Sequence, residues 1–247
     1  MKTFKQFENI NENINFTNES KSGLEGVIEY KDGLTEEIVK KKYSWLSDAK
    51  IEAAVIGEDK RGLVWYDGVW KNGTWKFGYW KKGTWGKGTW EDGEWHNGTW
   101  KNGTWLDGTW KKGTWEDGTW KNGTWKSGTW ENGTWENGKW YYGTWYDGTW
   151  KDGIWYYGTW KNGTWEDGRW KKGTWDDGTW EDGYWWGGTW QDGSWNSGTW
   201  SNGTWESGTW KYGWWHDGDW KNGRWRGGKI LKQETGEFEE SDEPPTI

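Results

Sequence analysis

The sequence predicts an all-β repeat protein, a β-solenoid with a five-residue period and a core of tryptophan rings. Three observations predict this fold. A run of 33 tryptophans begins at Trp65 and recurs every five residues through Trp225. A glycine follows each of these tryptophans three positions later, and Thr directly precedes Trp in 21 of the 33 units. A bulky apolar residue and a turn former that recur at one short period indicate a stack of identical small elements.

The composition of the repeat predicts that the core is made of indole rings. Between Tyr66 and Gly228 the only aliphatic side chains are Val69, Leu106 and Ile154. Burial of one Trp removes roughly 150–250 Å² of surface from water. Since ordering the chain costs about 1–2 kcal/mol per residue, most of these rings must be buried for the repeat to fold.

Each five-residue unit combines a turn signal with a strand signal. Asp or Asn precedes the repeat glycine in 20 of the 33 units, and such a pair suits a tight turn because Gly tolerates a positive φ. Thr and Trp favour extended backbone. We therefore expect the chain to change direction once in every unit.

One arrangement of these units is a meander or closed barrel of very short antiparallel hairpins. The segment Trp135-Glu136-Asn137-Gly138-Lys139-Trp140 resembles the turn of a tryptophan zipper, in which rings flanking an Asn-Gly turn pack across a hairpin. A two-residue turn leaves strands of three residues, however. Hydrogen bonds in an antiparallel ladder alternate between the two sides of a strand, so an odd length cannot join turns at both ends.

The other arrangement is a solenoid, in which each unit is one side of a coil. Over residues 49–228 the chain resembles the pentapeptide-repeat family, with Trp at the central inward position and Gly at the small inward position two places earlier. The resemblance implies a right-handed β-helix with four-sided coils. Four sides would give about eight coils and a rod of roughly 40 Å. The family favours Leu or Phe where this chain has Trp.

A weaker ten-residue period is superimposed on the repeat. Directly after Trp, Lys occupies 10 of the 16 positions 71, 81, 91 and so on to 221, but only 2 of the 17 positions 66, 76, 86 and so on to 226. Alternate units therefore have different surroundings. Opposite sides of a four-sided coil and a ten-residue hairpin would both produce this pattern, which leaves the choice open.

Outside the repeat, the sequence divides into three smaller regions. Residues 1–22, with a helical spacing at Phe4, Phe7, Ile10 and Ile14, form a flexible N-terminal segment and a candidate targeting peptide. Residues 23–64 are expected to form an α/β cap that includes the first, aliphatic repeats. Within the cap we expect a strand at 25–30, a helix from an N-cap at Thr35 to about Leu46, and a loop at 57–62. The repeat domain spans 65–228, and the acidic tail 229–247 is expected to be disordered.

The first residues resemble a targeting signal. Met1-Lys2-Thr3-Phe4-Lys5-Gln6-Phe7 is similar to the capsid-targeting peptide of T-even-like phage head proteins, and Ile10-Asn11-Glu12 is similar to their prohead-protease cleavage pattern. The resemblance implies a phage origin and proteolytic cleavage after Glu12. A signal peptide and a transmembrane segment are not expected, so the expected location is a phage virion or the host cytoplasm.

Charge and residue types exclude several functions. The net charge is −7, while residues 65–228 carry 20 Lys and Arg against 21 Asp and Glu, which gives neither a basic stripe for nucleic acid nor an acidic one for a nucleic-acid mimic. There is no cysteine, hence no disulfide and no thiolate metal site. His96 and His216 have no partner at ligand spacing, and carboxylates such as Glu116 and Asp117 are interspersed with lysines. We expect no catalytic residues, no metal and no cofactor.

Aromatic residues outside the regular Trp positions are the candidate binding residues. They occupy positions that are otherwise polar and could cover a seam, contact another chain or bind a ligand.

The expected function is that of a non-enzymatic structural repeat protein, a phage virion-associated scaffold or fibre-like component. Alternatives are a glycan or cell-surface binding module that uses these aromatics, and a DNA-mimic inhibitor of the pentapeptide-repeat type. Expected partners are other virion or surface proteins and glycans, without nucleic acid or membrane, and a homo-oligomer is left open. The candidate binding residues are Tyr141, Tyr142, Tyr146, Tyr156, Tyr157, Trp186 and Trp214.

Overall fold

The protein is a three-sided parallel β-solenoid in a computed structural model that describes residues 27–245. From Thr74–Trp75 to Trp214–Trp215, each two-residue strand pairs in parallel with the strand fifteen residues later, as Thr104–Trp105 does with Thr119–Trp120. Three five-residue units therefore make one coil. The 33 units give 11 coils, which stack side by side into a straight rod about 50 Å long at the usual strand spacing.

The three-sided cross-section corrects the four-sided one that the pentapeptide-repeat resemblance implies. The antiparallel meander is also wrong, because all the pairings between repeat strands are parallel. Trp135 and Trp140 lie on adjacent sides of a coil, with ring centroids 6.0 Å apart and planes at 75°, and do not face each other across a hairpin. A triangle turns the chain more sharply at each corner than a square, and the repeat glycines supply that turn.

The strands form three faces. After β3 (Gly62–Asn72), which spans two sides of the first coil, every strand consists of one Trp and the residue before it, from β4 (Thr74–Trp75) to β34 (Arg224–Trp225). One face runs from β5 (Tyr79–Trp80) through every third strand to β32 (Trp214–Trp215). The second face begins at β6 (Thr84–Trp85), and the third begins at β4. We call the face that begins at β5 the variable face and the other two the threonine faces.

The core consists of three columns of stacked indole rings. In the middle of the rod the ring centroids of Trp125 and Trp140 are 4.7 Å apart and their planes differ by 5°. Within a coil, successive rings meet edge to face, as Trp120 and Trp125 do at 6.0 Å and 75°. Both arrangements are favourable for aromatic pairs. Every repeat ring from Trp65 to Trp210 is fully buried, which confirms the expected tryptophan core.

The repeat glycines are required at the corners for two reasons. Their φ angles lie between 112° and 144°, a region that disfavours side chains. They also stack directly on one another: a Cβ at Gly128 would lie 2.3 Å from the carbonyl oxygen of Gly113 in the previous coil. The Asx residue before the glycine fixes the corner further, since Asp147 Oδ1 accepts a hydrogen bond of 2.7 Å from the N–H of Gly148.

A small cap closes the N-terminal end of the rod. β2 (Lys50–Asp59) runs antiparallel to β3 and covers the first coil, and β1 (Val27–Tyr30) pairs in parallel with β2. Residues 50–56, where the first aliphatic repeats are expected, therefore belong to a cap strand, and 57–59 continue that strand where a loop is expected. Helix α1 (Glu36–Lys42) has the predicted N-cap, Thr35, and is followed by the 3₁₀-helix η1 (Ser44–Asp48).

A hairpin extends one face at the other end. β35 (Lys229–Lys232) adds to the variable face by pairing in parallel with β32, and β36 (Glu237–Glu240) pairs antiparallel with β35. The sequence predicts disorder from residue 229 onward, whereas the structure forms this hairpin because β35 continues the ladder of the last coils. The N–H of Ser241 also donates to the carbonyl oxygen of Gly228 at 2.8 Å.

The ten-residue charge period acquires a different meaning in a fifteen-residue coil. Neighbours along a column are fifteen residues apart, so they fall in opposite phases of the ten-residue pattern. Lys121 thus lies 2.9 Å from Glu136, and Lys161 lies 2.6 Å from Asp176. The period keeps most lysines apart within each column.

Within residues 27–245 the structure has no helix long and apolar enough to cross a membrane. The expected short helix around Phe4 to Ile14 and the proposed cleavage point after Glu12 lie outside the described residues.

Candidate functional site

The residue before Trp distinguishes the variable face from the two threonine faces. On the threonine faces this position is Thr from Thr84 to Thr204 in one column, and Thr or Ser from Thr74 to Thr209 in the other. On the variable face it changes from coil to coil. The paired backbone is the same on all three faces, so packing inside the rod does not explain the difference. From β5 to β32 the residues are Tyr79, Glu94, Thr109, Thr124, Lys139, Ile154, Arg169, Tyr184, Thr199 and Trp214.

The corner that follows the variable face carries a basic stripe. We call it the lysine–tyrosine corner and define it as the residues one and two places after Trp in the nine variable-face units from Trp80 to Trp200. It contains seven lysines and no acidic residue. The matching corners after the two threonine faces, over the same coils, contain three lysines each with eight and nine acidic residues. The seven lysines are Lys81, Lys82, Lys111, Lys112, Lys126, Lys171 and Lys172.

This stripe corrects the expectation that the repeat has no basic stripe. The near-neutral total of the repeat holds, but the fifteen-residue coil separates the charges by corner. Net charges of +7, −5 and −6 on the three corners follow from the counts above (7 − 0, 3 − 8 and 3 − 9). Charge that alternates along the sequence is therefore segregated around the rod.

Most of the candidate aromatic residues gather beside the lysines. Tyr141, Tyr142, Tyr156, Tyr157 and Trp186 all belong to the lysine–tyrosine corner. The rings of Tyr141 and Tyr156 stack at 4.7 Å with planes 8° apart, and those of Tyr142 and Tyr157 stack at 5.5 Å and 9°. The ring faces between the partners are therefore covered.

Two candidates lie elsewhere. Tyr146 is half exposed but lies on the corner after the threonine face that begins at β6, away from the other tyrosines. Trp214 ends the variable face, where its ring packs edge to face on Phe238 of the C-terminal hairpin at 4.8 Å. Lys229 Nζ lies 4.5 Å from the centroid of the Trp214 ring. Trp214 is thus partly engaged in packing against the C-terminal hairpin.

Lysines lie over two of the aromatic rings of the lysine–tyrosine corner. Lys126 Nζ is 4.1 Å from the ring centroid of Tyr141, and Lys171 Nζ is 2.8 Å from that of Trp186. Such contacts arise because lysine and aromatic residues are neighbours in the same column. Cation–π attraction holds the ammonium groups along the column.

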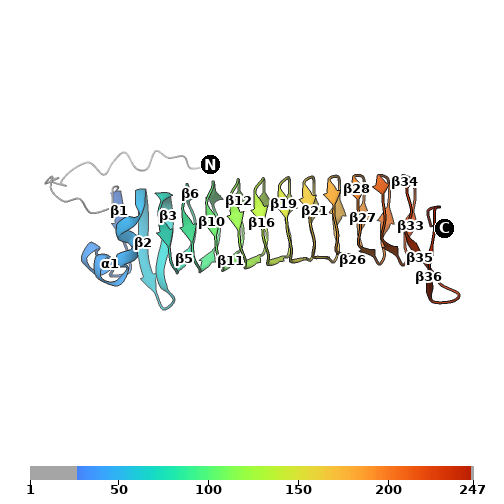
Figure 1. The fold of residues 1–247 in the computed structure, drawn as a ribbon. Helices are drawn as coiled ribbons and strands as arrows, with labels where there is room; N and C mark the ends of the chain where they lie inside the picture. Colours follow the sequence, from blue (N-terminus) through green and yellow to red (C-terminus); the bar gives the residue numbers. More distant parts are fainter. Residues whose placement is uncertain (1–26, 246–247) are drawn as a thin grey trace, which may run out of the picture.

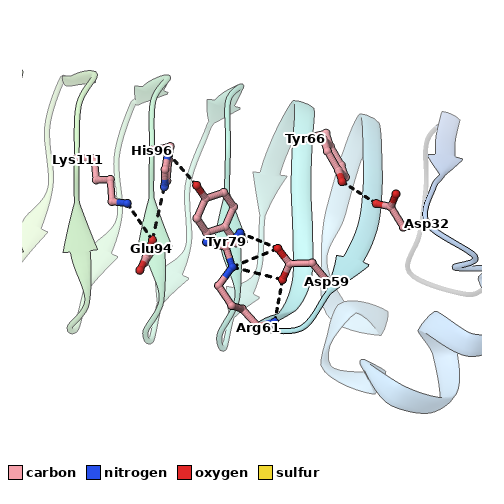
Figure 2. Close-up of polar contacts among 8 residues, drawn as sticks. All are labelled: Asp32, Asp59, Arg61, Tyr66, Tyr79, Glu94, His96 and Lys111. Carbon is pink, nitrogen blue, oxygen red and sulfur yellow. Dashed lines mark hydrogen bonds and ion pairs between the residues drawn. The ribbon is translucent and has the colours of Figure 1, made fainter.

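A polar network occupies the N-terminal end of the variable face (Figure 2). The guanidinium of Arg61 binds Asp59 and lies 3.8 Å above the ring of Tyr79. The hydroxyl of Tyr79 is 3.0 Å from His96 Nδ1. Glu94 then lies between His96 and Lys111, with Lys111 Nζ 3.2 Å from its carboxylate. His96 therefore has one partner, Tyr79, seventeen residues away, which local spacing along the chain does not reveal.

The environment of this network sets its protonation. Burial lowers the pKa of His96, and the positive charge of Lys111 lowers it further. Desolvation acts to raise the pKa of Glu94, but the contacts with Lys111 and His96 together outweigh it and the pKa falls. The network therefore contains a neutral imidazole beside an ionised carboxylate. Figure 2 also shows the hydroxyl of Tyr66 donating to Asp32 of the cap at 2.6 Å.

The network lacks the ligand set of a metal site. Across the described part of the chain, no group of three or more His, Cys, Asp or Glu side chains converges as metal ligands would. His216, the other histidine, packs edge to face on Phe238 at 4.8 Å, and burial lowers its pKa.

Sequence reasoning missed three residues of the variable face, of which Arg169 and Tyr184 are exposed and Ile154 is partly buried. Ile154, Arg169 and Tyr184 line one open hollow together with Asp152 and Asp167 of the neighbouring corner. A signal for them exists: eight of the twelve positions at which Thr does not precede Trp belong to one fifteen-residue series. That series begins at Val64 and ends at Trp214. Its spacing of fifteen residues equals three units, so it would also have indicated a three-sided coil.

Comparisons with protein-family models, with curated proteins and with solved structures find no match to this chain.

Proposed function

We propose that this chain is a non-enzymatic structural repeat protein that serves as a rigid scaffold. The observation that carries the proposal is the unbroken indole core, in which every repeat ring from Trp65 to Trp210 is fully buried. Each ring contacts rings of its own coil and of the coils above and below. Bending the rod would separate stacked pairs in at least one column, at a cost of about 0.5–1.5 kcal/mol per pair beyond lost burial.

The two ends of the rod are covered to different extents. At the N-terminal end β2 pairs along β3, which forms two sides of the first coil, and η1 contacts the third side, β4. At the C-terminal end β35 covers the variable face, whereas within residues 27–245 β33 and β34 pair only with strands of the previous coil. The cap therefore blocks addition of another copy at the N-terminal end and gives the scaffold a defined start.

We further propose that the scaffold belongs to a phage particle, on the resemblance of Met1 to Phe7 to a capsid-targeting peptide. Mass spectrometry of purified particles tests this placement. We expect peptides of the repeat domain in the particles and a new N-terminus at Asn13, produced by cleavage after Glu12. Absence of the chain from particles that are produced in cells expressing it would remove the virion assignment.

The second candidate function is a binding module for a glycan or cell surface. Five of the seven candidate aromatics lie on one corner and a sixth on the adjoining variable face, which favours this function. The double variant Tyr141→Ala, Tyr156→Ala should lose binding on a glycan array, while Tyr146→Ala, on a different corner, should retain it. Equal binding by both variants would count against the module.

A further inference from the structure

The lysine–tyrosine corner presents an extended row of positive charge. From Lys82 to Lys172 the row spans six steps of fifteen residues, about 29 Å at the usual strand spacing. Lys139 and Arg169 on the adjoining variable face add two further positive charges, and Glu94 is the single acidic residue there between β5 and β32. A linear partner could follow this row without bending.

Most of the lysines in the row lack an acidic partner. Lys82 pairs with Asp67 at 3.4 Å and Lys111 pairs with Glu94 at 3.2 Å. Over residues 27–245, the other five form no ion pair. The pKa of Lys171 is lowered, first by burial against its neighbours and then by repulsion from Arg169. The charge of the row is therefore not balanced within the protein.

From this arrangement we propose that the lysine–tyrosine corner binds a linear acidic polysaccharide. The ammonium groups meet the anionic groups of the polymer, and the tyrosine hydroxyls supply hydrogen bonds to sugar hydroxyls. Lysines that bind a polyanion release its condensed counterions, which drives association without a large buried area. That mechanism suits a convex corner. The inference rests on the binding module proposed above and names its ligand class.

Two features of the corner favour a polysaccharide over nucleic acid. Proteins hold single strands by stacking bases on open ring faces, whereas Tyr141 has Tyr156 against one face and Lys126 on the ring. A duplex winds once in about 34 Å, so its phosphates leave a straight row of lysines after part of a turn. An extended sugar chain can stay along the row.

A second copy of this chain fits the corner less well. The acidic corners of another rod have complementary charge, but two convex corners touch along a line. Stable protein interfaces bury at least about 1,200 Å² in total. Contact along a line does not reach that area.

The test compares two variants of equal charge. The corner variant carries Lys112→Gln, Lys126→Gln, Lys171→Gln and Lys172→Gln. The control variant carries Lys87→Gln, Lys101→Gln, Lys151→Gln and Lys211→Gln, which lie on the other two corners and form no ion pairs in the described chain. Binding of labelled polygalacturonate, neutral dextran, and single-stranded and duplex DNA is measured by fluorescence anisotropy over a range of salt concentrations. Circular dichroism establishes that both variants keep the wild-type fold.

We expect wild type and control to bind polygalacturonate at low salt, with affinity that falls as salt rises, and not to bind dextran. The corner variant should bind at least about 10-fold more weakly with a shallower salt dependence. Equal loss in both variants, or tighter binding of either DNA than of polygalacturonate, would overturn the proposal. So would a wild-type dimer in sedimentation velocity that the corner variant abolishes, since the occupant would then be a second copy. Binding of dextran without dependence on the four lysines would overturn the acidic ligand while leaving the binding module intact.

Discussion

The ring of Trp105 lies flat on that of Trp120, with centroids 4.7 Å apart and planes 5° apart. The two residues are fifteen apart in the sequence and adjacent in space, because three units of five close one coil. Every structural property of the rod follows from this relation, including the columns of the core, the ladder of glycines and the separation of charge by corner.

Substitution of a corner glycine should destabilise the rod strongly, and the chain contains a matched pair for the test. Gly188 has φ of +116°, and a Cβ there would lie 2.3 Å from the carbonyl oxygen of Gly173. Its neighbour Gly187 has no positive φ, and a Cβ there would meet nothing closer than 3.9 Å. We expect Gly188→Ala to lower the free energy of unfolding by about 2 kcal/mol or more, and Gly187→Ala to change it by less than about 0.5 kcal/mol. Urea denaturation measures both. Similar effects from the two variants would contradict the corner geometry.

Loss of one core ring should cost more than loss of an exposed ring of the same type. Trp135 is fully buried, whereas Trp186 is half exposed. Trp135→Leu removes stacking above and below and leaves a cavity, so we expect a loss of about 3 kcal/mol or more in unfolding free energy. Trp186→Leu should cost less than about 1 kcal/mol, the strength of an exposed cation–π contact. Denaturation followed by near-ultraviolet circular dichroism compares them, and equal costs would speak against a packed column.

Disulfide formation should report the number of sides directly, because the chain has no native cysteine. Thr129 and Thr144 are paired neighbours, and adjacent strands bring their Cα atoms to about 4.8 Å, within the range that a disulfide spans. The pair Thr129→Cys, Thr144→Cys should cross-link on oxidation. The pair Thr129→Cys, Thr149→Cys, adjacent only in a four-sided coil, should remain reduced in the monomer. Gel mobility or mass spectrometry reads the result, and the reverse pattern would show a twenty-residue coil.

Histidine protonation should weaken the N-terminal end of the variable face. Burial and Lys111 lower the pKa of His96 in the folded protein, so the unfolded chain binds a proton first as the pH falls through the ordinary histidine value of about 6.5. This contribution to stability is therefore present above that pH and is lost below it, down to the folded pKa. His96→Gln should show a smaller fall in Tm than wild type between about pH 7.5 and pH 5.5. An NMR titration that places the pKa of His96 above 6.5 would contradict the prediction.

The repeat made the solenoid and its core predictable, because only stacked units can bury rings that recur every five residues. The prediction of a four-sided coil came from the resemblance to the pentapeptide-repeat family, and a five-residue period is compatible with either three or four sides. The choice depends on the corner, where glycines with positive φ allow the sharper turn of a triangle. Substitutions such as Tyr79, Glu94 and Ile154, which interrupt the threonine pattern at multiples of fifteen, were the available signal. The strand at 50–59 escaped prediction because Ile51 and Ile56 happen to stand five residues apart.

The candidate site was predictable only in part. Exposed aromatics such as Tyr142 and Tyr157 stand out in a polar position of the repeat. The lysines beside them did not, because Lys82 and Lys172 are ninety residues apart in the sequence and their grouping depends on the length of the coil. The contact between His96 and Tyr79 was hidden for the same reason.

Tryptophan fluorescence of a variant without the exposed rings tests the buried indole columns most directly. Trp186→Phe with Trp214→Phe removes the two exposed rings that could dominate the signal. The native variant should emit at short wavelength, and acrylamide should quench it weakly until urea unfolds the rod. Red-shifted emission that acrylamide quenches readily in the native protein would show that water reaches the rings, and the account of a dry tryptophan core would be contradicted.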